Sequence, residues 1–595
     1  MSELTTTYEW STIPWRKLER KVFKLQKQIY QAACRGQRAK VRRLQRLLIH
    51  SWAARVLAVR RVTQDNAGKK TAGIDGLKSL PPNQRLELAQ RLQHHWGKAS
   101  PTRRVWIPNP GHSEEQRPLN IPTLADRAKQ TLFKLALEPQ WEAKFEPNSF
   151  GFRPGRSCHD AIMAIYLKIC HQPKWILDAD LARCFDTIAQ QPLLKKLNAS
   201  PFVTRQIRAW LQAVVMDNFQ YSETPEGVPQ GGSLSPLLAN VALHGMESYI
   251  ARYCKGAKVV RYADDLIVIH PERQGIEHAQ QLLTKWLQKM GLAFKPSKTR
   301  ICHTLNLVDE QIGFDFLGFS IRQYRMSKYK SGRSMKDYKT IIQPSKASMQ
   351  RHSQRLQAVI RSHKAAPQAA LIAHLNPIIR GWSAYFSAEC SKKAYSKLDY
   401  LLYQKLRAWA HRRHPHKSGH WRASRYWLVN EGAGWIFASR QGDQRMRLCT
   451  HIQTPIVRHV KVQGNRSPFD GDWSYWATRM GKHPELPTQI AKLLKQQRGQ
   501  CSYCGLYFKS EDLWEVHHVD RNHQNHQWGN LALLHQHCHD QVHSGVRNQH
   551  PVVEEPCEIN VSSTVLWTSG VGDCSAEFNS IPMNVRLHSL DAERF

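Results

Sequence analysis

The stretch from Val259 to Ile269 reads Val-Val-Arg-Tyr-Ala-Asp-Asp-Leu-Ile-Val-Ile. Two apolar runs around a polar break predict two short strands joined by a tight turn. The turn presents two adjacent carboxylates, Asp264 and Asp265. Adjacent ionised carboxylates repel each other, and a hard divalent cation such as Mg²⁺ relieves that repulsion. The stretch therefore predicts either a metal site or an ordinary polar hairpin tip, and the rest of the chain has to distinguish the two.

The composition of the 595-residue chain indicates a large multidomain globular protein, with 41% hydrophobic and 22% charged residues. Its net charge of +39 favours a polyanionic partner, because an uncompensated charge of this size repels itself. Nucleic acid is the expected partner, and an anionic membrane surface is the alternative. We find no apolar run that could span a bilayer and no signal peptide, so we expect a cytoplasmic protein with no membrane partner.

The N-terminal residues 1–70 form a basic extension that is predicted to be helical. Fifteen Lys or Arg and a single acid, Glu19, lie between Trp15 and Val62. Apolar residues recur at helical spacing through the same stretch. A solvated helix face usually mixes charges of both signs, so this one-signed enrichment favours contact with RNA or DNA.

The next segments suggest a basic hairpin and an arginine-bearing loop. Residues 101–121 read as a β-hairpin that contains Arg117, and Asp126 opens a helix after it. Arg153 and Arg156 lie among glycine and aromatic residues before another helix. We interpret these two arginines as candidate contacts to phosphate or template.

A third candidate acid follows the strand-like run Trp-Ile-Leu at 175–177. Asp178 and Asp180 alternate, so both would lie on one face of a strand. A carboxylate at the end of an apolar strand needs a charged partner or a metal. A few carboxylates that hold two metal ions form the usual clamp for phosphoryl transfer.

Cysteine and histidine pairs near the C-terminus have the spacing of a metal site. Cys501 and Cys504 form one pair, and His535 and Cys538 form another. Two such pairs fit a tetrahedral structural zinc, with unmetallated thiols and surface histidines as the alternative. The other cysteines have no framework spacing and are expected to be reduced thiols.

The ordered set of motifs resembles a known family. The most specific are Pro229-Gln230-Gly231 and Tyr262-Ala263-Asp264-Asp265, in a series of blocks around Asp75, Arg117, Phe152, Asp180, Gln230, Asp265, Lys298 and Gly318. This order is similar to that of reverse transcriptases, and the residues within the blocks resemble those of group II intron-encoded proteins of the bacterial maturase type.

The resemblance implies an α+β multidomain fold. Fingers and palm of a right-hand reverse transcriptase would occupy 71–330, and a helical thumb, or maturase domain X, 331–440. A DNA-binding segment would follow at 441–495, and a ββα-metal HNH endonuclease domain with a structural zinc at 496–550. Residues 551–595 hold seven acidic and two basic residues and stay unassigned.

The resemblance also assigns roles in the polymerase. Asp180, Asp264 and Asp265 would be the catalytic residues that bind two Mg²⁺ ions. Phe185 stands five positions after Asp180 and corresponds to the aromatic steric gate that selects deoxynucleotides. The remaining nucleotide-binding residues would be Arg117, Gln230 and Lys298. Asn109 stands where the family usually has Lys, which leaves that triphosphate contact open.

In the HNH segment, His518 corresponds to the general base that activates water. His517, His539 and His543 would hold the single endonuclease metal, expected to be Mg²⁺, and Asn530 would hold the loop. His535 is a departure, because cysteine is commoner at that zinc ligand. The loop from Val519 to Gly529 is short and lacks a glycine pair.

The expected function is that of a multifunctional intron-encoded protein. It would reverse transcribe intron RNA from dNTPs, assist splicing, and nick double-stranded target DNA to supply the primer. Three alternatives are a related reverse transcriptase without a maturase role, a non-catalytic RNA-binding splicing factor, and an RNA-dependent RNA polymerase. The motif Leu-Asn-Pro-Ile-Ile-Arg-Gly-Trp-Ser-Ala-Tyr-Phe at 375–386 and the HNH segment argue against the first alternative. The intact acids argue against the second, and Phe185 with the nuclease segment argues against the third.

Overall fold

The computed structural model describes residues 9–65, 71–94, 96–109, 112–326, 337–430, 434–441, 444–509 and 512–544. The chain divides into two compact units between Gln496 and Gln497. Each unit is described by itself below. The acidic segment 551–595 lies outside the described residues, as does most of the loop between the first two strands.

Helices dominate the beginning of the first unit. They are α1 (Trp15–Cys34), α2 (Arg38–His50), α3 (Trp52–Arg60), the π-helical turn η1 (Arg61–Asp65) and α4 (Pro82–Arg91). Leu18, Val22 and Ile29 of α1 are buried at helical spacing, and α1, α2 and α3 all contact α5 (Leu124–Glu142). The helices expected from the sequence are confirmed, and the apolar stripe explains why they pack while their basic faces stay outward.

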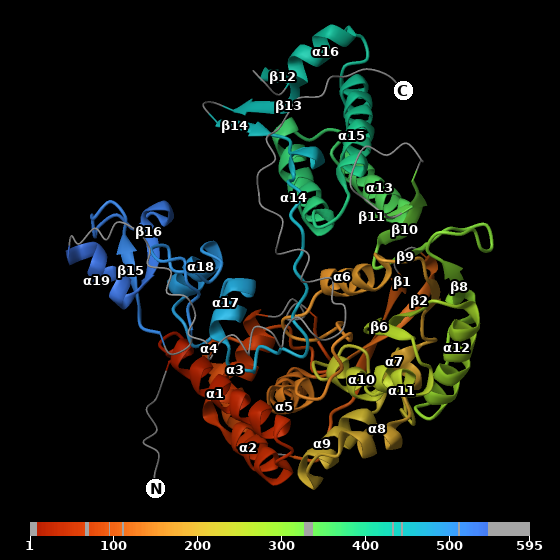
Figure 1. Cartoon of the computed structure of the whole chain (residues 1–595), viewed down its shortest axis with the longest axis vertical. Coiled ribbons are helices and arrows are strands. Elements are labelled where there is room, and N and C mark those ends of the chain that lie inside the picture. Colours follow the sequence, from red (N-terminus) through yellow and green to blue (C-terminus); the bar gives the residue numbers. More distant parts are fainter. Residues whose placement is uncertain are drawn as a thin grey trace. The chain divides into compact units, whose positions relative to one another are not determined.

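The sheet that carries the acidic hairpin has the strand order β6-β7-β3-β8. Its strands are β3 (Trp175–Ala179), β6 (Lys258–Tyr262), β7 (Asp265–His270) and β8 (Arg300–His303), and all neighbours are antiparallel. Helix α12 (Arg273–Gln288) packs against β3 and β7, and α6 (Cys158–Ile169) packs against β6 (Figure 1). The predicted hairpin is confirmed, with Tyr262 opposite Asp265 across the turn.

A second sheet contains the predicted basic hairpin, β1 (Thr102–Asn109) and β2 (His112–Ile121). Strand β4 (Val215–Asp217) adds parallel to β1, and β5 (Gln220–Ser222) completes the order β2-β1-β4-β5. Between and after these strands lie α7 (Cys184–Thr187), α8 (Gln190–Leu197), α9 (Pro201–Leu211), α10 (Ser235–Leu243), α11 (Met246–Tyr253) and the short 3₁₀ helix η3 (Pro296–Lys298).

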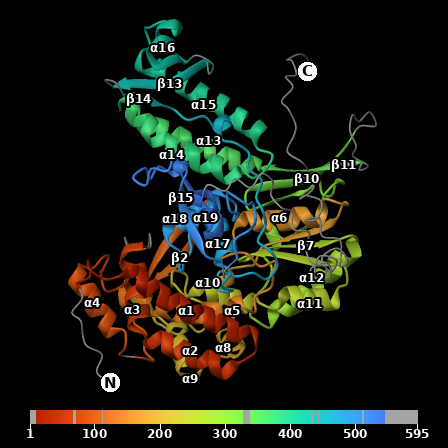
Figure 2. The same cartoon turned by 60° about the vertical axis from the view of Figure 1, so that its left-hand side comes forward.

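A three-stranded sheet leads into a helical bundle. Strands β9 (Phe314–Phe316), β10 (Phe319–Arg325) and β11 (Tyr338–Pro344) precede helices α13 (Lys346–Ser362), α14 (Gln368–Phe386) and α15 (Lys392–Arg413). These helices run beside one another in Figure 2. Trp409 is buried in their core, and Trp382 stacks on His352 with ring centroids 4.7 Å apart. Trp409 is therefore a core residue, and Trp382 is a partly buried residue packed against the neighbouring core.

The thumb that was expected to be helical over 331–440 is not helical at its end. After α16 (Gly419–Tyr426) the chain forms β12 (Trp427–Asn430), β13 (Gly434–Gln441) and β14 (Gln444–Arg447), an antiparallel sheet. Aromatic and branched residues fill β12 and β13, and such residues favour strands when one face packs on a core. The 3₁₀ turn η4 (His451–Gln453), α17 (Trp473–Met480) and α18 (Thr488–Gln496) end the first unit.

The second unit is small. Strands β15 (Trp514–His518) and β16 (Leu531–His535) pair antiparallel, and α19 (Gln536–Ser544) follows directly. The 3₁₀ turn η5 (Trp528–Asn530) precedes β16. This is a ββα arrangement, as the sequence resemblance implied. No helix in the described residues is both long enough and apolar enough to cross a membrane.

Candidate active sites and metal-ligand clusters

The tip of the β6–β7 hairpin holds Asp264 and Asp265. Ala263 occupies the left-handed region with φ of 58°, which produces the sharp turn that directs both acids outward from the strand ends. Arg261 lies buried beneath the tip and donates to the carbonyl oxygen of Ala263 at 2.8 Å and to Asn240 Oδ1 at 3.0 Å. Because a buried guanidinium needs such acceptors, these bonds fix the turn's geometry.

A loop from far earlier in the chain supports the same turn. The N–H of Phe150 donates to the carbonyl oxygen of Arg261 at 2.9 Å, and Ser149 Oγ accepts from the Arg261 guanidinium at 2.6 Å. A Cβ at Gly151 would lie 2.3 Å from the Ala263 nitrogen. Only glycine permits this approach of two backbones, so the residue before Phe152 is dictated by packing against the hairpin.

Asp180 follows β3, next to β7 in the sheet, and joins the two hairpin acids. Burial and the charges of Asp264 and Asp180 raise the pKa of Asp265 to about 7. Burial also raises the pKa of Asp264, and Asp180 adds to the effect. Ala179 pairs with Leu266 across β3 and β7, so Asp180 lies at the same end of the sheet as the two hairpin acids, in one partly desolvated site.

Asp178 has a different environment, although it alternates with Asp180. Arg300 of the adjacent strand β8 donates to Asp178 Oδ2 from Nε at 3.0 Å. Burial raises the pKa of Asp178 to about 6 against the opposing effect of Arg300. The structure therefore pairs Asp178 within the sheet and leaves Asp180 at the strand's end.

The predicted nucleotide-binding residues divide into two groups. Lys298 Nζ lies 2.9 Å from Asp180 Oδ2, so it belongs to the carboxylate cluster. Arg117 is exposed on β2 opposite Ile107, and no contact among the described residues links it to the acids. The contribution of Arg117 to nucleotide binding stays a prediction.

The segments that contain Phe185 and Gln230 are joined by two hydrogen bonds. The carbonyl oxygen of Phe185 accepts from the N–H of Val228 at 2.6 Å, and Gln230 Nε2 donates to Asp186 Oδ1 at 3.2 Å. Phe152 contacts Phe185 edge-on with ring centroids 6.3 Å apart and is half exposed, with a φ of 60°. The sequence shows Phe152 only as part of a motif, and its left-handed backbone and its contact with Phe185 make it a further candidate residue of the site.

The carboxylate site fits a divalent cation. Three acids from two strand ends converge where burial disfavours their ionised form, and a hard cation is the ligand that oxygen donors of this kind prefer. Asp180, Asp264 and Asp265 are the residues that would hold it.

The interpretation of Arg153 and Arg156 as phosphate contacts was wrong. Arg153 is buried and forms a bidentate pair with Glu142, with both N–O distances 2.9 Å. Arg156 donates to the carbonyl oxygen of Pro147 at 2.8 Å and to those of Gly464 and Arg466, each at 3.2 Å. Both guanidiniums donate to acceptors within the chain, and for Arg156 two of these acceptors lie more than 300 residues away, a pairing that no local pattern predicts.

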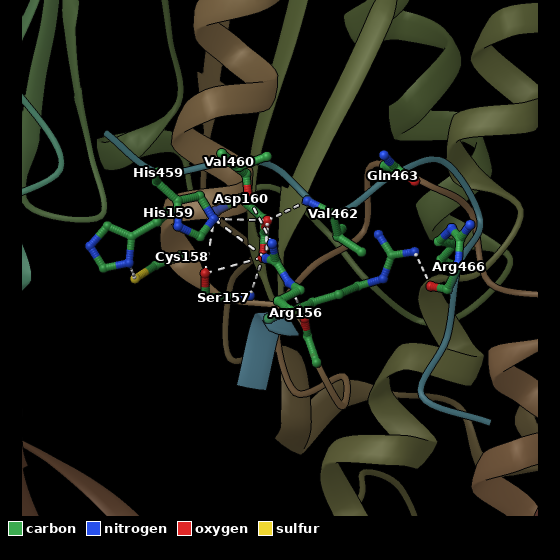
Figure 3. Close-up of polar contacts among 12 residues, drawn as sticks. Arg156, Ser157, Cys158, His159, Asp160, His459, Val460, Val462, Gln463 and Arg466 are labelled. Carbon is green, nitrogen blue, oxygen red and sulfur yellow. Dashed lines mark hydrogen bonds and ion pairs between the residues drawn. The ribbon is translucent and has the colours of Figure 1, made fainter. Parts of the chain in front are cut away.

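The partner of this loop is the segment 456–480, which we call the docking segment. Its anchor on α6 is Asp160, a fully buried carboxylate that caps the helix through Ser157. Figure 3 shows Asp160 accepting from the N–H of Val462 at 2.8 Å and lying 3.0 Å from His459 Nε2. Arg479 Nη2 completes the set at 2.7 Å. The segment predicted to bind DNA therefore uses these side chains to pack on helix α6.

In the second unit, Cys501, Cys504, His535 and Cys538 form one cluster whose ligand atoms all lie within 4.8 Å of one another. His535 Nδ1 lies 3.4 Å from Cys504 Sγ, and His535 Nε2 lies 3.3 Å from Asp512 Oδ2. A carboxylate on Nε2 fixes the tautomer that offers Nδ1 to a metal. Three sulfurs and one nitrogen suit a tetrahedral zinc, so the group fits the residues present.

His517, His539 and His543 form the second cluster, again within 4.8 Å. Their rings come from β15 and from one face of α19, because residues four apart in a helix are neighbours. His539 Nδ1 lies 2.8 Å from Glu515 Oε2, which again orients an imidazole as metal ligands require. Three imidazoles therefore converge as a set that fits a catalytic divalent ion.

His518 is adjacent to this cluster on β15 and faces the loop 519–529. Its Nε2 lies 3.5 Å from His526 Nδ1. Asn530 holds that loop, since its side chain accepts from the N–H of Asp520 and donates to the carbonyl oxygen of Asn525, both at 2.8 Å. The short loop thus has the side-chain tie that the resemblance implied.

Four family models match the chain. Residues 10–92 match the N-terminal domain of reverse transcriptase, and residues 107–321 match reverse transcriptase (RNA-dependent DNA polymerase). Residues 349–427 match the group II intron, maturase-specific domain, and residues 501–545 match HNH endonuclease.

Named relatives agree with these matches. The chain is 34% identical over 233 residues to Protein YkfC of Escherichia coli, covering 36% of this chain and 59% of the relative. It is 35% identical over 190 residues to the group II intron-encoded protein LtrA of Lactococcus lactis, covering 31% of each. A maturase-like protein of Euglena gracilis is 29% identical over 65% of this chain and 78% of its own length. The matched regions thus span less than two thirds of the first two relatives.

The acid-tipped sheet and the matched domains define a multidomain reverse transcriptase. Its further matches, to the group II intron maturase-specific domain, to HNH endonuclease and to LtrA, make the chain similar to the group II intron-encoded proteins within that class.

Proposed function

We propose that the protein reverse transcribes a group II intron RNA, assists its splicing, and nicks target DNA to supply the primer for intron homing. The observation that carries the proposal is the convergence of Asp180, Asp264 and Asp265 at one end of the sheet, where burial and the neighbouring carboxylates raise the pKa of Asp265 to about 7. A fold keeps such a cluster where function needs it, because three acids in a partly desolvated site cost stability without a cation. The protein would act in the cytoplasm, with intron RNA, double-stranded DNA and dNTPs as partners.

The polymerase chemistry would be divided between cation and protein. Bound Mg²⁺ supplies charge neutralisation at the triphosphate and acidifies the primer 3′-hydroxyl. The three acids hold the cations, and Lys298 beside Asp180 adds a positive charge near the triphosphate position. Phe185, supported by Phe152, excludes a 2′-hydroxyl by contact. The chain's own share is positioning and fixed charge.

The endonuclease chemistry would use the second unit. His518 accepts the proton of the attacking water, and His517, His539 and His543 hold the ion that stabilises the phosphate's developing charge. The zinc cluster has no part in the reaction and ties β15, β16 and α19 to the Cys501 turn. Removal of zinc is therefore expected to unfold this unit.

The polymerase proposal is tested by replacing Asp264 and Asp265 together with Asn, which preserves side-chain volume. Primer extension on an RNA template is expected to fall by more than about a thousandfold, because neutral amides do not hold the cations. Glu277→Ala, which removes an exposed surface ion pair on α12, is the matched control and keeps full activity. Extension by the double variant at the wild-type rate would refute the polymerase assignment.

A further inference from the structure

The far end of the helical thumb contains an open cavity of about 780 Å³ between α15, α16 and β13. It is separate from the carboxylate site, which lies on the palm sheet. Cavities of this size accommodate small ligands of the dimensions of a nucleotide. Its walls combine aromatic rings with guanidinium groups, and no acidic residue is among the described residues that line it.

Two aromatic side chains on the wall remain exposed. Trp435 and Phe437 lie two residues apart on β13 and thus share one face. Phe437 is buried against Trp409 and Trp427, whereas Trp435 is 56% exposed, beyond the end of that core. Tyr403 of α15 is 44% exposed and rests edge-on against Trp427. Flat rings held at a cavity wall without being covered are suited to stack on another planar group.

The cations around these rings are held in place. Arg407 lies 5.8 Å from the centre of the Tyr403 ring, and Arg422 donates to the carbonyl oxygens of His414 at 3.1 Å and Lys417 at 2.6 Å. Between Tyr400 and Leu428 the sequence has seven Lys or Arg and no acid. The field at the cavity is therefore positive, and an anionic ligand is favoured.

We infer that this cavity binds an unstacked nucleotide of single-stranded RNA, with its base against Trp435 or Tyr403 and its phosphate on Arg407. An acidic peptide would use the cations but leave the two exposed rings without a planar partner, whereas a nucleotide uses both. A base inside a duplex is already stacked and does not enter. The inference rests on the proposed binding of intron RNA and deepens it by naming a contact point.

The test uses the full-length protein and a 12-residue oligouridylate with one central 4-thiouridine, which is photo-crosslinked and mapped by mass spectrometry. Crosslinks are expected in the tryptic peptides 398–405 and 426–440, which contain Tyr403 and Trp435. Excess unlabelled oligouridylate should remove them, whereas an RNA duplex or an oligoglutamate peptide should not. Crosslinks found only outside these peptides, or equal competition by the acidic peptide, would overturn the inference.

Two variants sharpen the result. Trp435→Ala and the milder Arg407→Gln should each lower crosslinking at these peptides, by about tenfold for the loss of the stacking ring. Tyr253→Ala, which removes an exposed aromatic ring from α11, should leave it unchanged. The unfolding midpoint of each variant shows whether it folds. If both folded variants crosslink like wild type, the cavity does not bind RNA.

The outcome is independent of the polymerase test. The Asp264→Asn with Asp265→Asn variant should retain the thumb crosslink, because those acids lie outside the cavity. If this variant loses primer extension but also shows no crosslink at the thumb peptides, the cavity inference is refuted and the polymerase assignment stands. Normal primer extension by the acid variant would refute the polymerase assignment and leave the cavity result standing.

Discussion

At the scale of single residues, position along the strand decides the role of each acid. Asp178 lies within β3, where Arg300 on the neighbouring strand reaches it, and Asp180 lies just past the strand's last residue. Asp178 and Asp180 are only two residues apart, yet only Asp180 lies beside the hairpin acids. The sequence predicted the hairpin and its two acids, because adjacent carboxylates between apolar runs are a local pattern. It did not distinguish Asp178 from Asp180 without the family resemblance, since the arginine partner comes from a distant strand.

Phe185 is the residue on which sugar selection is predicted to depend. Replacing it with Ala removes the ring that would contact C2′ and leaves space for a 2′-hydroxyl. Ribonucleotide incorporation should rise by roughly tenfold or more relative to deoxynucleotides, measured by single-nucleotide extension on a gel. Phe219→Ala, at an exposed position on the β4–β5 turn, is the control. An unchanged ratio would show that another group excludes the hydroxyl.

His518 is the residue on which DNA nicking is predicted to depend. His518→Ala removes the proton acceptor and should lower nicking by about a hundredfold or more, with primer extension retained because the polymerase acids lie in the first unit. A supercoiled plasmid bearing the target site reports nicking directly. His278→Ala on exposed α12 is the control. Nicking at the normal rate would remove His518 from the base role.

At the scale of elements, the docking segment makes contacts with a distant helix that a local sequence pattern cannot predict. The family resemblance assigned 441–495 to DNA binding, yet Arg479 is directed inward to Asp160. Trp476 packs so closely on the Gly155 backbone that a Cβ there would lie 2.5 Å from its ring. The helices and the hairpins were predictable because their periodicity is local. The β12–β14 sheet and the docking contacts depend on partners elsewhere in the chain, so periodicity did not predict them.

Asp160→Asn should release the docking segment. Removing one partner of a buried charged cluster leaves Arg479 and His459 without their acceptor, so unfolding is expected to become easier by about 3 kcal/mol. Denaturant unfolding measures the loss. Glu277→Gln, which breaks the exposed pair with Arg273, should cost under about 1 kcal/mol. Equal losses for the two variants would show that Asp160 is no anchor.

The lowered pKa of Asp160 makes the stability of the folded protein depend on pH. Burial alone would raise the pKa of Asp160, but His459, Arg479 and the N–H of Val462 together hold it well below its usual value. A carboxylate whose pKa is lowered by folding stabilises the folded protein at every pH above its pKa in the unfolded chain, about 4. This stabilisation is lost as the pH falls below that value. The stability gap between wild type and Asp160→Asn should therefore narrow below about pH 4. A gap that stays constant from pH 6 to about 3 would contradict this.

At the scale of the whole molecule, charge dominates the interaction with RNA. The net charge of +39 implies that binding releases many counterions. Affinity for intron RNA should therefore fall by roughly a thousandfold or more between about 50 and 200 mM salt. Filter binding across this range gives the slope, and Trp435→Ala should leave the slope unchanged because stacking releases no ion. A nearly flat salt dependence would exclude a phosphate-dominated interface.

The contact between Asp160 and His459 also sets an order of events during synthesis. The two residues are separated by 299 positions, so at about 5–20 residues per second Asp160 emerges from the ribosome roughly 15–60 s before its partners exist. During that interval the polymerase domain displays an unmatched carboxylate and an uncovered apolar patch beside Gly155. The nascent chain is therefore exposed to misfolding and aggregation until residue 480 has been added.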